Sequence, residues 1–158
     1  MIPDEEMARA VRAVVIAAEN YRLRAARTVL GVGSTEMSAL FFLFAEGTST
    51  PTELAGRLQI TTASVTELVE RLGRAGLARR APHPHDRRKV VLSLTDTARE
   101  QVGEMVGRIA VSTARCTSLL STDERETVLR FLHDLALAYS ATSPIPQAGG
   151  AVLRPPGL

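Results

Sequence analysis

The sequence predicts a mainly α-helical fold that contains one small β-hairpin. Hydrophobic residues make up 45% of the 158 residues but aromatic residues only 4%, so Leu, Val and Ala must fill the interior. That composition favours packed helices over an aromatic-rich β-sandwich. Apolar residues recur at helical spacing along most of the chain. Only residues 77–94 combine two apolar flanks with a short polar tip, as a hairpin does. The length suits one domain with its own core, and two lobes that share a smaller core also fit.

The N-terminal third is predicted to form two helices. Residues 4–30 carry one apolar stripe at helical spacing, made by Met7, Val11, Val14, Val15, Ala18 and Tyr21. Gly31 and Gly33 then interrupt the pattern, and a short apolar helix follows over residues 35–45. Gly47 stands where a C-terminal cap is expected, because glycine readily adopts the left-handed backbone that ends many helices.

The next segment is predicted to form a helix-turn-helix. Thr50, Pro51 and Glu53 have the order of an N-terminal capping box with proline at the first helical position, so a short helix should begin there. After a connection of only a few residues, Thr61 is placed to cap a second helix. Two short helices joined so tightly are typical of a helix-turn-helix, whose second helix reads DNA. We call this second helix the reader helix.

A hairpin and two further helices are predicted to complete the ordered part of the chain. Residues 77–94 form the hairpin, which we call the wing. A long helix begins at Thr95 and Asp96, and its apolar positions include Val102, Met105, Val106 and Ile109. Ser121 and Glu124 form another capping box ahead of a last helix over residues 122–139. From Ser140 onward Pro, Gly and Ala dominate, which predicts a flexible tail.

The long terminal helices have broad apolar faces that the small central part of the chain can cover only in part. Packing these faces against a second copy is the simplest way to bury them, so we expect a two-fold homodimer built from the first, fifth and sixth helices. The single cysteine, Cys116, lies in the apolar pattern of the fifth helix, where we expect a buried structural thiol rather than a redox sensor. A single cysteine forbids an internal disulfide, in keeping with a reducing compartment.

Positive charge is concentrated in the centre of the chain. The formal net charge is only +2, yet residues 57–89 contain eight basic and three acidic residues, so the remainder is net negative. A cationic face on an acidic body is typical of a nucleic-acid binder. The alternative is an ordinary solvated charged face. A helix followed by a basic hairpin favours the first interpretation, since the helix fits the major groove and the hairpin reaches the backbone or minor groove of duplex DNA.

The reader helix supplies most of the candidate DNA contacts. Four apolar residues should pack inward, namely Val65, Leu68, Val69 and Leu72. The opposite face carries the candidate contacts Thr62, Ser64, Thr66, Glu67 and Arg71. The hydroxyls can meet base edges or phosphates, Glu67 can accept from a cytosine amine, and Arg71 suits a phosphate or a guanine. Thr61 is expected mainly to cap the helix, whereas the hydroxyls of Thr62, Ser64 and Thr66 are expected to be freer. The alternative is that Ser64 and Glu67 only support the first turn.

The wing tip supplies the remaining candidates. Arg87 and Arg88 are the strongest of these, and Asp86 is expected to orient an arginine through a paired hydrogen bond rather than to contact DNA. Arg79 and Arg80 alternate across their strand, so at most one of them should face DNA.

Other kinds of site find little support. His83, His85 and Asp86 superficially resemble a metal cluster, but the only other histidine is His133 in the last helix, and a metal site usually needs more ligands. The chain has no phosphate-binding glycine loop and no convincing Ser, His and Asp set. We therefore expect no metal site, no cofactor and no enzymatic activity.

No signal sequence opens the chain and no apolar run approaches the ~20 residues of a membrane span, which predicts a cytoplasmic protein without a membrane partner.

The order of elements and the stretch LAGRLQITTASVTELVERLGRAGLARRAPHPHDRRKVVLSLTDTA resemble the multiple-antibiotic-resistance regulator (MarR) family from about residue 4 to residue 139. The most specific part is Asp86-Arg87-Arg88 followed by residues 90–95, which is similar to that family's Asp-x-Arg wing signature. The resemblance implies a homodimeric winged helix-turn-helix transcription factor that binds pseudo-palindromic operators. It implies that this factor is commonly a repressor, released by a small, often aromatic or phenolic, ligand. Glu67 departs from the family pattern, because many relatives carry a basic or neutral polar residue there.

The prediction from the sequence is therefore a homodimeric, DNA-binding transcriptional regulator with a winged helix-turn-helix between long terminal dimerisation helices. The alternative is a winged-helix protein-interaction module with only non-specific affinity for DNA. The resemblance also implies a ligand cleft between the dimerising helices and the winged helix. Tyr21, Arg22 and Arg24 lie near that region, but residues of this kind are more often core and surface, so the sequence identifies no ligand-binding residue. The predicted organisation is a dimerisation region (1–30 and 96–140), a DNA-binding region (31–95, with the reader helix at about 61–74 and the wing at about 77–94) and a tail (141–158).

Overall fold

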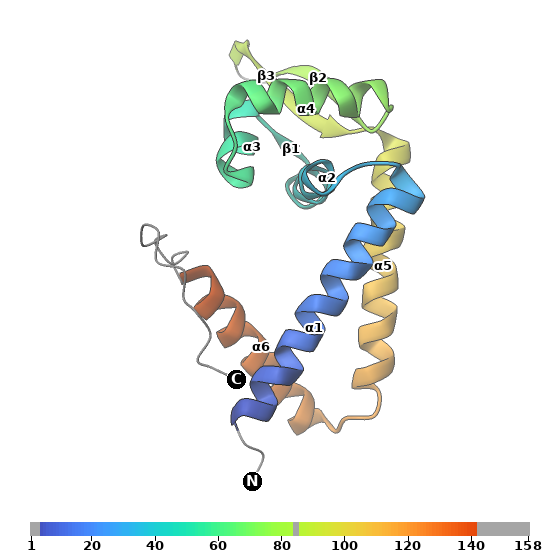
Figure 1. The fold of residues 1–158 in the computed structure, drawn as a ribbon, viewed down its shortest axis with the longest axis vertical. Coiled ribbons are helices and arrows are strands. Elements are labelled where there is room, and N and C mark those ends of the chain that lie inside the picture. The colour runs from blue at the N-terminus through green and yellow to red at the C-terminus, as the bar shows by residue number, and fades with distance from the viewer. Residues whose placement is uncertain (1–3, 84–85, 142–158) are drawn as a thin grey trace, which may run out of the picture. The chain divides into compact units, whose positions relative to one another are not determined.

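The computed structural model describes residues 4–83 and 86–141, apart from the side chains of Arg87 and Arg88. The predicted tail beyond residue 141, as well as Pro84 and His85, lies outside the described residues. The chain divides into two compact units, residues 1–110 and 111–158. In chain order the elements are α1 (Asp4–Ala25), a π-helical turn (Ala26–Leu30), α2 (Ser34–Glu46), β1 (Thr48–Ser49), α3 (Pro51–Leu58), α4 (Thr62–Arg74), β2 (Ala78–His83), β3 (Asp86–Leu94), α5 (Asp96–Thr117) and α6 (Thr122–Ala141) (Figure 1). The mainly α-helical fold with a small β-hairpin is confirmed.

The predicted first helix changes its winding near its end. Regular α-helix stops at Ala25, and the π-helical turn that follows is closed by Gly31, whose φ of 64° is left-handed. The Gly31 N–H donates to the carbonyl of Ala26. The side chains of Ala25 and Ala26 are buried, so this end of the helix reaches the core. The apolar stripe that predicted the helix ends at Tyr21, before this turn begins, and the pattern therefore did not reveal it.

A three-stranded antiparallel sheet contains the predicted wing. α2 ends at Gly47 as expected, with a φ of 79° and its N–H donating to the carbonyl of Leu43. The two residues of β1 follow directly and pair with β3, which also pairs with β2, so that the strand order is β1-β3-β2. The sequence analysis missed β1, because two residues are too few to show alternation. In the wing, Ala78 lies opposite Leu94 and Pro82 opposite Val90.

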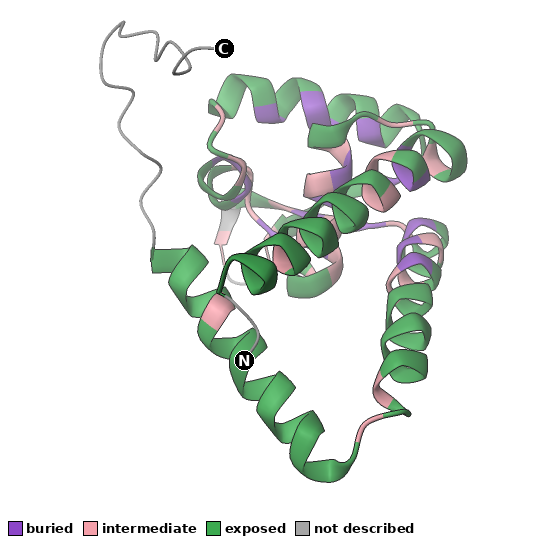
Figure 2. Cartoon of the chain, turned by 60° about the horizontal axis from the view of Figure 1, so that its bottom comes forward, coloured by how far each residue is buried: buried purple, intermediate pink, exposed green. Residues whose placement is uncertain are grey.

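The hydrophobic core lies in the first unit. Figure 2 shows that burial is concentrated in α2, α4 and the first turns of α5, whereas α1 is exposed along most of its length. The four residues of α4 that were expected to face inward, Val65, Leu68, Val69 and Leu72, are each at most 4% exposed. The other large side chains that are fully buried include Met37, Leu40, Leu43, Leu54, Leu92, Leu94 and Val102. The reader helix is therefore anchored by one apolar face.

Thr95 connects the wing to α5. Its N–H donates to the carbonyl of Leu77 and its hydroxyl to the carbonyl of Gly76, at 3.1 and 2.7 Å. The same hydroxyl oxygen accepts from the N–H of Ala98 at 3.2 Å and so caps α5. The base of the wing and the start of α5 are thereby held together.

The second unit contains α6 and the last turns of α5. The predicted capping box is confirmed, since the Ser121 N–H donates to the Glu124 carboxylate at 2.8 Å and the Glu124 N–H donates to the Ser121 hydroxyl at 3.3 Å. The hydrogen bond from the Ser121 N–H is the main reason that the pKa of Glu124 is lowered. α6 has no buried residue.

The expected burial of Cys116 is wrong for the single chain, in which this side chain is exposed. The apolar pattern of α5 continues into a stretch where every residue from Arg108 to Cys116 is exposed. An apolar stripe marks a face that favours burial, and within one copy this part of the helix does not achieve it.

The part of the chain that the structure describes has no single helix long and apolar enough to cross a membrane. Only the helical segments Asp4–Leu30 and Ser34–Glu46 taken together, bent by 92° at their junction, have the required length and composition.

Candidate nucleic-acid interface

The two helices of the predicted helix-turn-helix, α3 and α4, both begin at side-chain caps. The Thr50 N–H donates to the Glu53 carboxylate at 2.7 Å, and the Glu53 N–H donates to the Thr50 hydroxyl at 3.3 Å. These bonds confirm the capping box, and the bond from the Thr50 N–H is the main cause that lowers the pKa of Glu53. Between the helices Gln59 adopts a left-handed φ of 54°, which ends α3 and turns the chain toward α4.

The reader helix, α4, presents all five of its predicted DNA contacts to solvent. Thr62, Ser64, Thr66, Glu67 and Arg71 are exposed, and the buried apolar face lies among α2, α3 and the sheet. The cap at Thr61 is confirmed, because its hydroxyl accepts from the Ser64 N–H at 3.1 Å. These five side chains therefore lie on the surface of one helix, and the burial of its apolar face directs them toward solvent.

Two of the hydroxyls are less free than expected. The Ser64 hydroxyl lies 2.9 Å from the Thr61 hydroxyl, in a hydrogen bond in which either group can donate. The Thr66 hydroxyl donates to the carbonyl of Thr62 at 3.1 Å. Both oxygens can still accept a hydrogen bond, so these hydroxyls are partly committed within the chain and remain candidate contacts. A helix offers a serine or threonine such local partners one turn away.

Arg71 is held by a residue that the sequence analysis did not consider. Its Nε donates to Glu36 Oε1 at 2.9 Å, and its Nη2 lies 2.9 Å from the same oxygen. Glu36 belongs to the first turn of α2, so the pair connects the reader helix to a core helix. No local pattern could indicate this contact, since 35 residues separate the two side chains.

The wing lies beside the reader helix in the same unit, and β2 packs against α4 (Figure 1). Arg79 Nε donates to the Ser93 hydroxyl at 3.2 Å, and its Nη2 lies 3.6 Å from Asp96 Oδ1. Arg80 is exposed and points to the opposite face of the strand. Arg79 is thus committed to β3 and α5, which leaves Arg80 as the stronger DNA candidate of the two.

The wing tip is described only in part. The backbones of Arg87 and Arg88 lie in β3, but their side chains are outside the described residues. Asp86 Oδ2 lies 3.9 Å from Lys89 Nζ. Pairing of Asp86 with an arginine therefore stays a prediction. His85 also lies outside the described residues, and the residues that are described contain no group of three or more His, Cys, Asp or Glu able to hold a metal ion.

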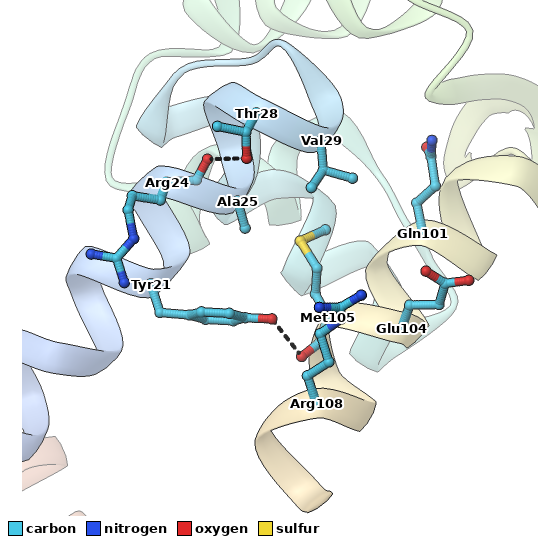
Figure 3. A pocket seen from close by; sticks show the side chains of 9 residues that line it. All are labelled: Tyr21, Arg24, Ala25, Thr28, Val29, Gln101, Glu104, Met105 and Arg108. Atoms are coloured by element: carbon cyan, nitrogen blue, oxygen red, sulfur yellow. Dashed lines mark hydrogen bonds between the residues drawn. The ribbon is translucent and has the colours of Figure 1, made fainter. Parts of the chain in front are cut away.

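A pocket of about 330 Å³ opens between α1 and α5 of the first unit. Figure 3 shows Tyr21 reaching across it, and the Tyr21 hydroxyl donates to the carbonyl of Met105 at 3.2 Å. Charged side chains at the rim come from both helices and include Arg24, Glu104 and Arg108, whereas Ala25, Val29 and Met105 supply apolar surface.

Arg22, which lies next to Tyr21 in the sequence, does not line this pocket and instead connects α1 to α2. Its Nη1 donates to the carbonyl of Ser34 and to the hydroxyl of Ser38, at 3.2 and 3.1 Å. Its Nε donates to Glu19 at 2.9 Å, and this hydrogen bond is the main cause that lowers the pKa of Glu19. Of the three residues expected near a ligand cleft, Tyr21 and Arg24 line the pocket and Arg22 has a structural role.

Comparison with known proteins agrees with this architecture. A profile of the MarR family matches residues 30–89. The chain is 34% identical over 113 residues to the "Uncharacterized HTH-type transcriptional regulator Mb0904" of Mycobacterium bovis, a match that covers 72% of this chain and 78% of that protein. Among solved structures, RV1404 from Mycobacterium tuberculosis aligns with a TM-score of 0.67 at 21% identity, over 90% of this chain and 98% of that one. A mutant of S. aureus MepR bound to an oligodeoxyribonucleotide aligns with a TM-score of 0.59 at 20% identity, over 84% and 97% of the two chains. These two structural matches establish the fold.

Proposed function

The chain belongs to the MarR family, and on that premise we propose that it is a homodimeric transcriptional repressor that binds a pseudo-palindromic operator and is released by a small ligand. The observation that carries the proposal is the reader helix, whose buried apolar face directs Thr62, Ser64, Thr66, Glu67 and Arg71 to the surface beside a basic wing. No catalytic step is part of the proposal.

The mechanism divides the contacts between the two elements. α4 enters the major groove, where its hydroxyls, Glu67 and Arg71 meet base edges and phosphates. Arg87 and Arg88 of the wing contact the backbone or the neighbouring minor groove, with Asp86 orienting an arginine. In a two-fold dimer the two reader helices address half-sites roughly one helical turn apart.

Dimerisation is supported by apolar side chains that a single copy leaves in solvent. Val14, Val15 and Ile16 of α1 are each more than half exposed, as are Leu129, Leu132 and Leu137 of α6. Large apolar side chains that are exposed in a soluble protein mark an interaction site where they gather into a patch. A second copy of the chain covers it in the proposal, as closed two-fold symmetry is the commonest arrangement of homo-oligomers.

The pocket between α1 and α5 is the proposed effector site. Its volume of about 330 Å³ lies within the range of small-molecule sites, and its apolar floor with Arg24 at the rim suits an aromatic carboxylate or phenolate. A set of such compounds is expected to raise the melting temperature of the wild-type protein and to have less effect on Arg24→Ala. Equal stabilisation of both proteins would place the ligand elsewhere.

The function is tested by measuring binding of the purified protein to the intergenic DNA upstream of its own gene and to an unrelated duplex of equal length, over a range of salt concentrations. An operator-reading regulator is expected to prefer the first duplex by a factor of ~10³ or more. Equal affinity for both duplexes that vanishes together as salt rises would contradict the proposal. That result would instead support the alternative, a winged-helix protein-interaction module with a generic cationic face.

A further inference from the structure

The ion pair between Glu36 and Arg71 links the reader helix to α2, which lies outside the helix-turn-helix and the wing. Arg71 uses Nε and Nη2 on a single oxygen, Glu36 Oε1, with both nitrogens at 2.9 Å. A guanidinium has five N–H groups, so three of them stay available for DNA. The Arg71 side chain is 48% exposed, so about half of it is accessible to solvent.

Glu36 itself is confined. Its side chain is only 16% exposed, and it belongs to the first turn of α2, which is anchored in the core by Met37 and Leu40. Its second oxygen, Oε2, lies 2.8 Å from the position that a Cβ on Gly33 would occupy. The absence of a side chain at Gly33 therefore leaves room for the carboxylate, which is enclosed between Gly33 and Arg71.

Arg71 has a second acidic neighbour on its own helix. Glu67 precedes it by four residues, and a Glu followed by a basic residue at this spacing is a favourable pair on an isolated helix. In the structure Arg71 pairs with Glu36, and Glu67 is exposed with no ion pair among the described residues. The contact with Glu36 therefore keeps the guanidinium away from Glu67 and leaves the Glu67 carboxylate on the DNA-facing surface.

The Arg71 side of the pair is 48% exposed, and an ion pair with one partner so accessible to water contributes little to stability. A role in orientation explains the arrangement better than a role in holding the fold together. We propose that Glu36 is a positioning residue for operator recognition: it directs the free edge of Arg71 toward DNA and prevents Arg71 from neutralising Glu67. This inference rests on the proposed function, and it adds a specificity determinant on α2, outside the helix-turn-helix.

The test compares wild type, Glu36→Gln, Arg71→Ala and the double variant. Each is titrated against a duplex that the wild-type chain selects from a random pool and against an unrelated duplex of equal length. Glu36→Gln is expected to lower the ratio of specific to non-specific affinity by about threefold to tenfold. Its non-specific affinity should not fall, because a negative charge near DNA has been removed. In the Arg71→Ala background the same substitution should cause no further loss of the ratio.

Two further variants separate positioning from charge and from folding. Glu70→Gln removes one negative charge from an exposed site of α4 and should change the ratio by less than about twofold. Gly33→Ala keeps every charge but displaces the Glu36 carboxylate, so it should lower the ratio in the same direction. Thermal unfolding of each variant establishes that it is folded.

The inference is overturned if Glu36→Gln leaves the ratio unchanged, or if it lowers the ratio equally in the presence and absence of Arg71. The second result would assign Glu36 a structural role at the start of α2. If the wild-type chain selects no sequence from the pool, the proposed function is wrong, and the inference that depends on it is wrong as well. A selected sequence combined with additive effects of the two substitutions would remove the inference alone.

Discussion

The polar side chains on the reader helix differ in how much hydrogen-bonding capacity they have left for DNA. Ser64 and Thr66 are already bonded within the helix, at 2.9 and 3.1 Å, so their oxygens are mainly acceptors toward an incoming ligand. Arg71 retains three N–H groups beyond its contact with Glu36. Phosphates and guanine edges accept hydrogen bonds, and Arg71 has more donors left for them than Ser64 or Thr66 has.

At the wing, Arg88→Ala is expected to weaken binding to the selected duplex by ~1–3 kcal/mol and to reduce the salt slope by about one phosphate contact. The reason is the loss of a charge-assisted hydrogen bond to DNA. Fluorescence anisotropy over a range of salt concentrations measures both quantities. Arg99→Ala, which removes an exposed arginine from α5, serves as the charge-matched control. Unchanged affinity of the Arg88 variant would exclude this residue from the mechanism.

At the scale of single elements, the helix-turn-helix depends on its caps and on one apolar face. The capping box of α3 and the cap of α4 begin both helices at defined residues, and four buried side chains set the rotation of α4 about its axis. A change in that rotation would turn the polar face away from DNA, because neighbouring positions on a helix differ in direction by about 100°.

Leu68→Ala is expected to lower the free energy of unfolding by ~2–5 kcal/mol, since Leu68 is 1% exposed and the substitution leaves a cavity in the core. Urea unfolding followed by circular dichroism measures the change. Glu70→Ala, on the exposed side of the same helix, should cost far less. Equal losses for both variants would show that α4 is not anchored through this face.

The cap of α3 is expected to make stability depend on pH. Hydrogen bonds from Thr50 lower the pKa of Glu53 in the folded chain. A carboxyl group with a lowered folded pKa contributes stability above its unfolded pKa, and this stability is lost as the pH falls through the folded value. Glu53→Gln should therefore be less stable than wild type at neutral pH, and the difference should shrink as the solution is acidified. Urea unfolding at a series of pH values tests this, and a difference independent of pH would contradict it.

At the scale of the whole molecule, the apolar residues divide into a covered and an uncovered set. Residues of α2, α4, β3 and the start of α5 form the core of the first unit, whereas α6 has no buried residue at all. Large apolar side chains are exposed along α1, the middle of α5 and α6. One copy of the chain therefore buries the apolar residues of the winged helix but leaves those of the terminal helices exposed.

The wild-type protein is expected to be a dimer at micromolar concentration, and Leu132→Glu is expected to shift it toward monomer. Leu132 is 51% exposed in the single chain, and a buried, unpaired carboxylate at an interface is costly. Light scattering coupled to size exclusion measures the mass. Glu126→Gln, a change at an exposed polar position of α6, should leave the dimer intact. A monomeric wild-type protein would contradict the proposed dimer.

The helices, their N-terminal caps, the two faces of the reader helix and the position of the wing could all be predicted from the sequence. Each of these depends on residues within a few positions of one another, as in the Thr50–Glu53 and Ser121–Glu124 boxes, and such short-range patterns are visible in one dimension. An apolar stripe does not by itself predict burial within one chain, because Cys116 belongs to the apolar stripe of α5 and is nevertheless exposed.

Contacts between side chains that are far apart in the sequence are visible only in the folded chain. Glu36 holds Arg71 from 35 residues away, and Tyr21 bonds to Met105 from 84 residues away. The strand β1 exists because β3 offers it a partner, and the pocket exists because α1 and α5 come together at Tyr21 and Met105. Such contacts depend on the packing of whole elements in the folded core. The spacing of residues along the chain specifies which face of a helix is apolar, but not which side chain of another element it will meet.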